Sequence, residues 1–548
     1  MSITGGETKG HVFGAGKGKA VTFKCEKAMV KKTQVSVSNG KVDKNVYGGG
    51  EIGRVEEDTD VKIGVGDGTC NPTISGSVYG AGAGLETHGY SALVRHNTTV
   101  TVDGGATIGQ SVYGGGEIAS VGRYGLDEHK MPEILLDGGY CYVKVQGSAT
   151  IGSNTVQGNV FGACKGVVPH FDKTNADRSK RSRRMTVYSA DDFPEGAKID
   201  ATTGNASSMT STNTTWEYYD ESVTPKLVWE YFQEEDGYNK YLETLALATH
   251  PEVTIDGGAT VNGSVYGGGE MGLTKGSVMV NILGGTITED VYGGGALANT
   301  NTTSAVGVLD NAGIPQKTNG QYQTTTVHPK TTVNLLGGSM RDAYGGGLGQ
   351  LALAAQGTEG QTGYQAAVPA IEAKVNGNVK VNLNGLQAAT DINTTILNSL
   401  TTGSKLDAVG SGYIVKSSAK GAVVNRVFGC NNLNGTPTKK VQVYVFGTQK
   451  SDKAQLNLKA EKNTNTYDVQ AVYGGGNLAP YVPADALLDY EQNKATVDAA
   501  RPEVYIDGCD LTSIKQVYGG GNAASVPATF VEIRRCYEID EVFGGGNG

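Results

Sequence analysis

The chain has 548 residues, of which 82 are Gly and 14 are Pro, so Gly makes up about 15% of the sequence, roughly twice its usual share. Because these glycines show no G-X-Y period and lie in short clusters between β-branched runs, the composition excludes collagen and argues against low-complexity disorder. The formal net charge of −9 argues against a nucleic-acid partner, which requires clustered Lys and Arg.

A short motif, Val followed by an aromatic residue and Gly, recurs along the whole chain. Its Val residues, here called anchors, are Val12, Val46, Val78, Val112, Val160, Val265, Val291, Val427, Val472, Val517 and Val542, and Ala343-Tyr344-Gly345 is a variant of the motif. The shortest gaps between anchors are 26 residues, from Val265 to Val291, and 25 residues, from Val517 to Val542. Longer gaps indicate the same unit with an insertion.

A second element precedes the anchors in several units. Residues 99–105, 253–258, 278–285 and 332–338 alternate apolar and polar side chains and end in a Gly pair. The alternation predicts a strand with one buried face, and the Gly pair predicts a turn. A shorter strand follows, for example at residues 106–108 and 259–261, and then the anchor with its Gly triplet.

Such a unit cannot bury its apolar face alone, but it can do so when it stacks in register on identical units. The repeat therefore predicts an all-β fold, a parallel β-helix or β-solenoid with Gly-rich turns. Immunoglobulin-like sandwiches need about 100 residues per domain, and propeller blades need ~40–45 residues, so both are too large for the shortest units.

The fifth residue after each anchor predicts side-chain ladders between coils. In the last four units this residue is Asn432, Asn477, Asn522 and Asn547. Four successive Asn at one position predict an asparagine ladder, in which each amide bonds to the next. In the first half, the same position predicts surface ion pairs of Lys17 with Glu51 and of Glu117 with Lys165.

The residue after each anchor is always aromatic, and it has two interpretations. It is either a tyrosine stripe on which sugar rings stack, or a stack that seals each coil beside its Gly turn. Since a repeat in every coil is typical of a structural role, we favour the second interpretation. The alternation alone does not decide whether the Val or the aromatic residue faces the core.

Parallel β-helices host polysaccharide lyases and hydrolases, whose chemistry needs converging carboxylates. Glu51 and Glu117 are the best candidates, because they share one position two coils apart, at about 9.6 Å from the strand spacing. Asp103, Asp256 and Asp507 share another position and have the pattern of turn residues. We interpret both sets as structural, and we expect no catalytic residues.

The sequence predicts no metal and no cofactor. Its seven His residues form no H-E-x-x-H motif, and its seven Cys residues form no C-x-x-C motif. Cys164 and Cys430 replace Gly within the turn triplet, and we expect them to be packed thiols. Cys509 and Cys536 occupy equivalent places one unit apart, where oxidation to a disulfide depends on their geometry.

The insertions divide the chain into five regions. We expect solenoid coils at 1–166, 252–348 and 421–548, an inserted subdomain at 167–251 and an inserted loop region at 349–420. The first insertion contains both tryptophans of the chain. Its aromatic residues, Trp216, Tyr218, Tyr219, Trp229, Tyr231 and Phe232, are either a small cluster packed on the coil or a contact patch for a glycan or a protein.

The repeated Val-Tyr-Gly-Gly-Gly-[Glu/Asn] motif, with its alternating strands and Asp-Gly-Gly turns, resembles Gly-rich repeat proteins of bacterial cell surfaces. These are large β-helical, adhesin-like proteins that are frequent in gut Bacteroidetes. The resemblance covers nearly the whole chain outside the insertions. It implies an extracellular or surface location and a partner that is a host or microbial glycan or a surface protein.

The sequence therefore predicts a non-enzymatic adhesive or structural stalk. One alternative is a carbohydrate-active β-helix enzyme, and a second is a filament subunit that associates through the ends of the solenoid. No apolar stretch reaches the ~20 residues of a membrane span, and residues 1–6 lack the pattern of a secretory signal. Since the sequence starts and stops within a repeat unit, we expect it to be a segment of a longer protein or of a fibre.

Overall fold

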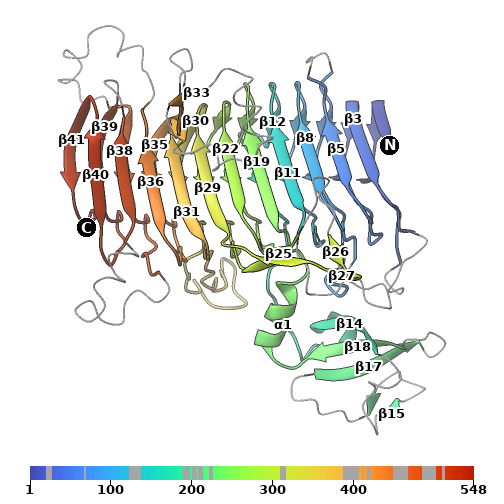
Figure 1. Cartoon of the computed structure of the whole chain (residues 1–548). Helices are drawn as coiled ribbons and strands as arrows, with labels where there is room; N and C mark the ends of the chain where they lie inside the picture. The colour runs from blue at the N-terminus through green and yellow to red at the C-terminus, as the bar shows by residue number, and fades with distance from the viewer. Residues whose placement is uncertain are drawn as a thin grey trace.

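In the computed structural model, the chain is described except for residues 20–27, 67–69, 90, 123–137, 189–197, 200–205, 208–213, 221–225, 309–315, 387–405, 410–411, 416–420, 449–466, 484–500 and 509–511. The predicted all-β solenoid is confirmed. Twenty-nine strands pair in parallel, coil after coil, and form one long stack with the two termini at opposite ends (Figure 1).

Each coil contributes a long strand to the first face of the solenoid, visible side by side in Figure 1. These strands are β1 (Ser2–Thr8), β3 (Thr33–Val42), β5 (Thr59–Ile63), β8 (Thr98–Val102), β11 (Tyr140–Val145), β19 (His250–Ile255), β22 (Val278–Ile282), β29 (Lys330–Leu335), β31 (Asn378–Leu383), β36 (Val441–Val445), β38 (Glu503–Asp507) and β40 (Phe530–Arg535).

Two further sets of short strands complete the coils. After the Gly turn come β6 (Thr73–Ile74), β9 (Thr107–Ile108), β12 (Thr150–Ile151), β20 (Thr260–Val261) and β23 (Thr286–Ile287). The anchors lie in β2 (Val12–Phe13), β4 (Val46–Tyr47), β7 (Val78–Tyr79), β10 (Val112–Tyr113), β13 (Val160–Phe161), β21 (Val265–Tyr266) and β24 (Val291–Tyr292). From β30 (Ser339–Tyr344) onward the two sets merge into single strands, β35 (Val423–Phe428), β37 (Val469–Tyr473), β39 (Ser513–Tyr518) and β41 (Glu538–Phe543).

The anchors pair in perfect register and form part of the main core. Val112 pairs with Val78 on one side and Val160 on the other, and all three side chains are fully buried among the Val and Ile residues of the other strands. The anchor Val therefore faces the inside of the coil, and β-branched side chains suit this pleated, fully buried position.

The aromatic residues point the other way and form a second buried cluster. Neighbouring rings stack with centroids 4.6–5.0 Å apart and planes within 12° of parallel. The stack comprises Phe13, Tyr47, Tyr79, Tyr113, Phe161, Tyr266, Tyr292, Tyr344, Phe428, Tyr473, Tyr518 and Phe543. Because most of these rings are less than 6% exposed, the structural interpretation of the repeat is confirmed.

The Gly triplets allow the backbones of successive coils to approach closely. A Cβ atom on Gly114 would lie 2.2 Å from the carbonyl oxygen of Gly162 in the next coil, and one on Gly345 would lie 2.4 Å from that of Gly429. Any larger residue at this first position of the triplet would therefore separate the coils. The need for Gly here comes from contact between coils.

Several smaller elements lie outside the solenoid. The first insertion contains the antiparallel sheet of β14 (Arg183–Tyr188), β17 (Thr214–Asp220) and β18 (Lys226–Phe232), the pair β15 (Lys198–Ile199) with β16 (Ala206–Ser207), and the helix α1 (Glu235–Leu242). Two further pairs are β25 (Ala305–Gly307) with β28 (Thr324–Thr326) and β26 (Lys317–Thr318) with β27 (Gln321–Tyr322). A last antiparallel sheet consists of β32 (Gly385–Leu386), β33 (Leu406–Val409) and β34 (Gly412–Val415). Within residues 349–420, β31 pairs with β29 and β36 and so belongs to the solenoid. In the part of the chain that the structure describes, no helix has the length and hydropathy to cross a membrane.

Candidate functional site

The two glutamates proposed as alternative catalytic residues each have a separate partner. Glu51 forms an ion pair with Lys17 at 3.0 Å, and Glu117 forms one with Lys165 at 2.9 Å, as the repeat predicted. Glu117 also accepts a hydrogen bond of 2.5 Å from the hydroxyl of Tyr47. Both carboxylates are therefore held by neighbouring coils.

The aspartates of the Asp-Gly turns shape the backbone. The carboxylates of Asp103 and Asp256 each accept a hydrogen bond of 2.7 Å from the amide of the Gly that follows. Asp507 instead forms an ion pair with Arg535 at 2.9 Å. The interpretation of Asp103 and Asp256 as turn residues is confirmed.

The predicted asparagine ladder is present and continuous. The side-chain amide of Asn477 donates to Asn432, that of Asn522 donates to Asn477, and that of Asn547 donates to Asn522, each at 2.9 Å. Such amide chains link successive coils through side chains, in addition to the backbone ladders.

A second asparagine ladder was not predicted. Asn334 donates to Asn281, and Asn382 donates to Asn334, both at 2.8 Å, and all three side chains are fully buried. They lie on the neighbouring strands β22, β29 and β31. The sequence contains the signal, a Val-Asn-[Ile/Leu] triplet in three successive units at residues 280–282, 333–335 and 381–383.

The described residues of the insertion at 167–251 form a small subdomain against one side of the solenoid, with α1 nearest the coils (Figure 1). Phe232, Tyr238, Tyr241, Leu242 and Leu245 form its buried cluster, which packs on Ile118, Val167 and Phe171. Tyr231 is also buried, at 2% exposure. These aromatic side chains thus form a packed cluster.

Hydrogen bonds also hold the subdomain to a distant coil. Tyr238 donates to the carboxylate of Glu86, and the hydroxyl of Tyr241 donates to the Glu86 carbonyl at 2.7 Å. The amide of Met185 in β14 donates to the carbonyl of Thr87 at 2.8 Å. These three hydrogen bonds attach the subdomain to a coil about 100 to 155 residues earlier in the sequence.

The predicted contact residues differ in their surroundings. Trp229 is partly exposed; the guanidinium of Arg183 lies 4.0 Å above its ring, and the ring of His88 meets it edge-on at 6.0 Å. Trp216, Tyr218 and Tyr219 lie on β17, which pairs with β18, and their side chains lie outside the described part of the structure. Among the predicted contact residues whose side chains the structure describes, Trp229 is thus the partly exposed one.

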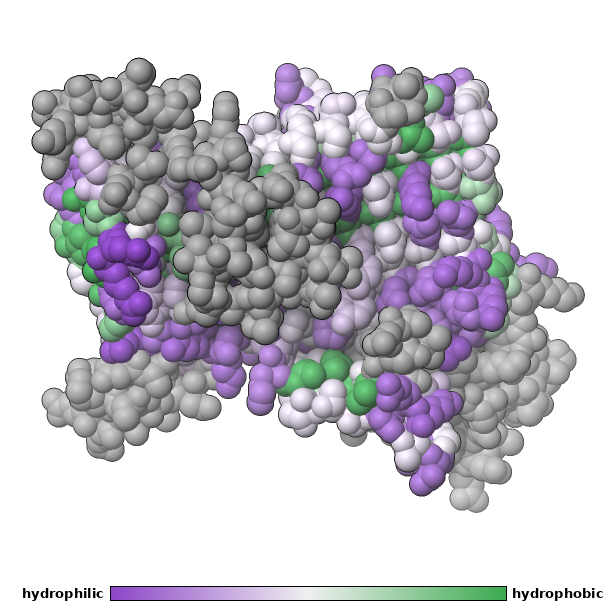
Figure 2. Space-filling view, turned by 45° about the horizontal axis from the view of Figure 1, so that its top comes forward, coloured by the Kyte–Doolittle hydropathy of each residue, from purple (hydrophilic) through white to green (hydrophobic). Residues whose placement is uncertain are grey.

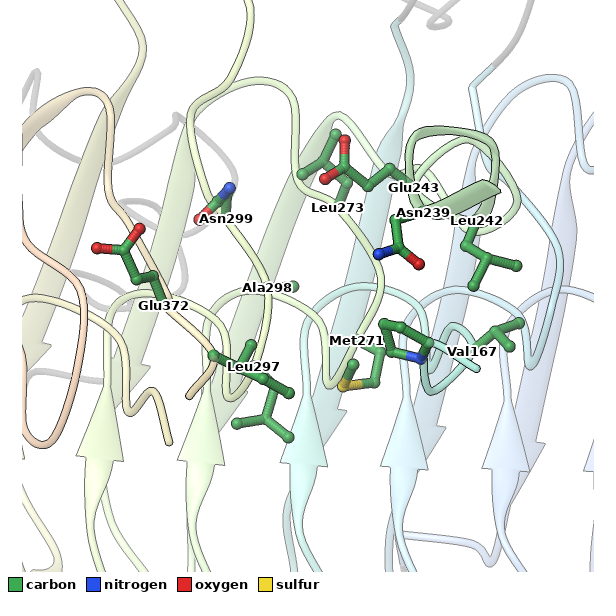
Figure 3. Close-up of a pocket in the computed structure, with 12 residues that line it drawn as sticks. Val167, Asn239, Leu242, Glu243, Met271, Leu273, Leu297, Ala298, Asn299 and Glu372 are labelled. Carbon is green, nitrogen blue, oxygen red and sulfur yellow. The ribbon is translucent and has the colours of Figure 1, made fainter. Parts of the chain in front are cut away.

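A groove lies between α1 and the solenoid (Figure 3). Its volume is about 220 Å³. Its apolar lining comes from Val167, Pro169, Leu242, Met271, Leu273, Leu297, Ala298 and Ile371, and its polar lining comes from Asn239, Glu243, Asn299 and Glu372. Burial raises the pKa of Glu243 above its usual range. The groove could not be predicted from the sequence because its walls come from separate repeat units and from two insertions.

The cysteine thiols and the potential metal ligands show no reactive grouping in the described residues. Cys164 and Cys430 are fully buried, as predicted for packed thiols, and burial raises the pKa of both above its usual range. Cys509 lies outside the described residues, so its pairing with Cys536 stays a prediction. Among the described residues, no three His, Cys, Asp or Glu side chains are grouped to hold a metal ion.

The surface visible in Figure 2 carries hydrophilic bands interrupted by smaller hydrophobic areas, where it is not covered by grey atoms.

No protein-family model, no curated protein and no solved structure matches the sequence. The assignment to the β-solenoid class therefore stands on the repeat and on the parallel stack of coils described above.

Proposed function

We propose that this chain is a non-enzymatic repeat protein of the bacterial surface, in which a stiff solenoid presents inserted loops to a glycan or protein partner. The observation that carries the proposal is the unbroken aromatic stack from Phe13 to Phe543. The gaps between its rings in the sequence range from 25 to 105 residues, yet the ring spacing stays between 4.6 and 5.0 Å. Insertions therefore leave the coil spacing unchanged.

A coil spacing that does not depend on the length of the insertions suits a stalk. The strands of each coil pair with strands of the adjacent coils, so loops can vary without changing the axis that carries them. Backbone ladders and the ring stack connect successive coils from Phe13 to Phe543, and the asparagine ladders add side-chain links from Asn281 onward. Loops on such a frame are typical binding elements.

Affinity electrophoresis against a panel of host and plant polysaccharides tests the binding part of the proposal. We expect at least one polymer to retard the chain, and we expect Trp229→Ala to weaken the retardation about tenfold if the subdomain is the contact. Tyr537→Ala, a change at a partly exposed residue between β40 and β41, is the matched aromatic control. Melting curves of both variants show whether the fold is retained.

If no polysaccharide retards the chain, the same variants are tested against surface proteins of the host. A chain that binds neither class contradicts the adhesive part of the proposal. Retardation that Trp229→Ala and Tyr537→Ala weaken equally would show that the subdomain is not the contact.

A further inference from the structure

We propose that the groove between α1 and the solenoid binds a Lys or Arg side chain that is flanked by apolar residues on a partner protein. This inference rests on the proposed function and deepens it, because it names the class of partner for one site. Its three supports are the apolar lining of the groove, the acidic groups at its rim and the hairpin beside it.

The lining is apolar at its base and has no aromatic or basic side chain. Eight of its twelve residues are Val, Pro, Leu, Met, Ala or Ile, and the other four are Asn or Glu. Sugar rings are usually held by aromatic faces, and phosphate by Arg or Lys, so this lining favours neither ligand. Its volume of about 220 Å³ exceeds the ~150 Å³ of a cavity that holds benzene.

The charged groups of the rim favour a cation. Glu243 is the C-terminal cap of α1, so its carboxylate lies where the helix dipole already contributes partial negative charge. In the described part of the chain, no basic side chain forms an ion pair with Glu243, although Lys240 and Lys275 lie near enough to oppose the rise of its pKa. Lys240, the basic residue of the last turn of α1, pairs with Asp236 at 2.7 Å. A bound ammonium or guanidinium group would compensate both the carboxylate and the helix end.

Of the remaining polar side chains of the rim, Asn299 already accepts a hydrogen bond of 2.9 Å from the amide of Lys374, and Asn239 and Glu372 carry further acceptor oxygens. The side-chain oxygen of Asn239 is buried and has no hydrogen-bond partner in the structure. Glu372, whose side chain is half exposed, lies in the same groove and contacts Lys374 at 2.6 Å. In Figure 3, Asn239 and Glu243 approach the groove from the α1 side and Glu372 lies across it. A ligand with several N–H donors satisfies this arrangement.

An exposed hairpin extends the apolar surface beside the groove. Residues 350–371 form an antiparallel ribbon whose base pairs Gln350 with Ile371, a residue of the groove lining. One rung further out, Leu353 pairs with Val368, and Leu353 is 60% exposed. The apolar residues that flank the basic side chain of the partner would contact this ribbon, since exposed apolar groups near a pocket are typical of protein contacts.

Isothermal titration of the full chain with two short peptides tests the proposal. The probes are acetyl-Leu-Lys-Leu-amide and its uncharged counterpart acetyl-Leu-Gln-Leu-amide. We expect the lysine peptide to bind at least about tenfold more tightly at low salt and to lose affinity as salt is added. We expect Glu243→Gln to reduce the affinity for the lysine peptide about tenfold and to leave that for the glutamine peptide unchanged.

The matched control is Glu235→Gln, which removes an acidic group from the first turn of the same helix, outside the groove lining. Equal affinity for the two peptides, no binding of the lysine peptide, or equal effects of Glu243→Gln and Glu235→Gln would each overturn the inference. The polysaccharide panel is run on the same variants. If the peptides do not bind while a polysaccharide still retards the chain, the inference fails and the proposed function stands.

Discussion

The hydroxyl of Tyr113 donates a hydrogen bond to the carboxylate of Glu270, which lies two coils further along the solenoid. The same relationship joins Tyr47 to Glu117, and in reversed polarity the amide of Asn432 donates to the hydroxyl of Tyr292. The ring stack and the position five residues after the anchor are therefore connected across three coils. This linkage gives Glu117 a structural role.

Loss of the Tyr113 hydroxyl should destabilise the solenoid. Tyr113→Phe keeps the ring in the stack but leaves the partly buried carboxylate of Glu270 without this donor, at an expected cost of about 1–2 kcal/mol. Tyr344→Phe is the control, because the described residues include no hydrogen-bond partner of the Tyr344 hydroxyl. Denaturant unfolding of both variants checks the prediction, which fails if they lose equal stability.

The closeness of successive coils gives a second prediction. In Gly345→Ala, the new Cβ would lie 2.4 Å from both the Gly429 carbonyl oxygen and a methyl group of Val379, so we expect a loss of at least about 2 kcal/mol. Gly10→Ala has open space around the new Cβ and should change stability little. Thermal melting of the two variants measures the difference. A Gly345→Ala variant as stable as Gly10→Ala would show that the coils can separate at no cost.

The buried asparagine ladder should contribute more to stability than the partly exposed one. Asn334→Ala leaves the Asn281 oxygen and the Asn382 amide without their shared partner in a fully buried position, at an expected cost of about 2–4 kcal/mol. Asn477→Ala breaks two similar bonds where water can replace them, and it should cost less than half as much. Urea unfolding compares the two, and an equal loss would contradict the argument.

Burial of His250 should make stability depend on pH. Burial lowers the pKa of His250 to about 4 from its usual 6.5. As the pH falls from 6.5 to about 4, the unfolded chain therefore binds a proton at this residue that the folded chain does not, so the free energy of unfolding decreases. His250→Gln should remove this part of the decrease, on the order of 2 kcal/mol. Urea unfolding at pH 7 and pH 4.5 checks it; parallel pH profiles of the two proteins would contradict it.

The stacking of coils could be predicted from the sequence because the motif in each repeat fixes which residues of successive coils are aligned. The Val-aromatic-Gly motif places Val112 beside Val78 and Val160, and the asparagines beside one another, without knowledge of the insertions. The orientation of the motif could not be predicted, because both of its side chains are buried. The aromatic residue is covered by groups two coils away, such as Glu270 over Tyr113.

The groove and the docking of the subdomain could not be predicted for a different reason. The contacts of Tyr238 and Tyr241 with Glu86 join residues about 150 positions apart that share no repeat. Glu243 and Glu372 likewise come from two insertions whose relative position depends on the number of coils between them. No local pattern encodes such contacts. The buried asparagine ladder is different, because the Val-Asn-[Ile/Leu] triplets in the sequence are a sufficient signal to predict it.

The central proposal is that this solenoid presents contacts without cutting its partner. It is tested most directly by measuring the length of a polysaccharide after incubation with the protein. Each polymer of the panel is incubated with the chain, and its size distribution is measured by size-exclusion chromatography with light scattering. The account predicts that every polymer, including any that retards the chain, keeps its original length. Shortening of a polymer, reduced in Glu51→Gln or Glu117→Gln, would contradict the account and support the carbohydrate-active alternative.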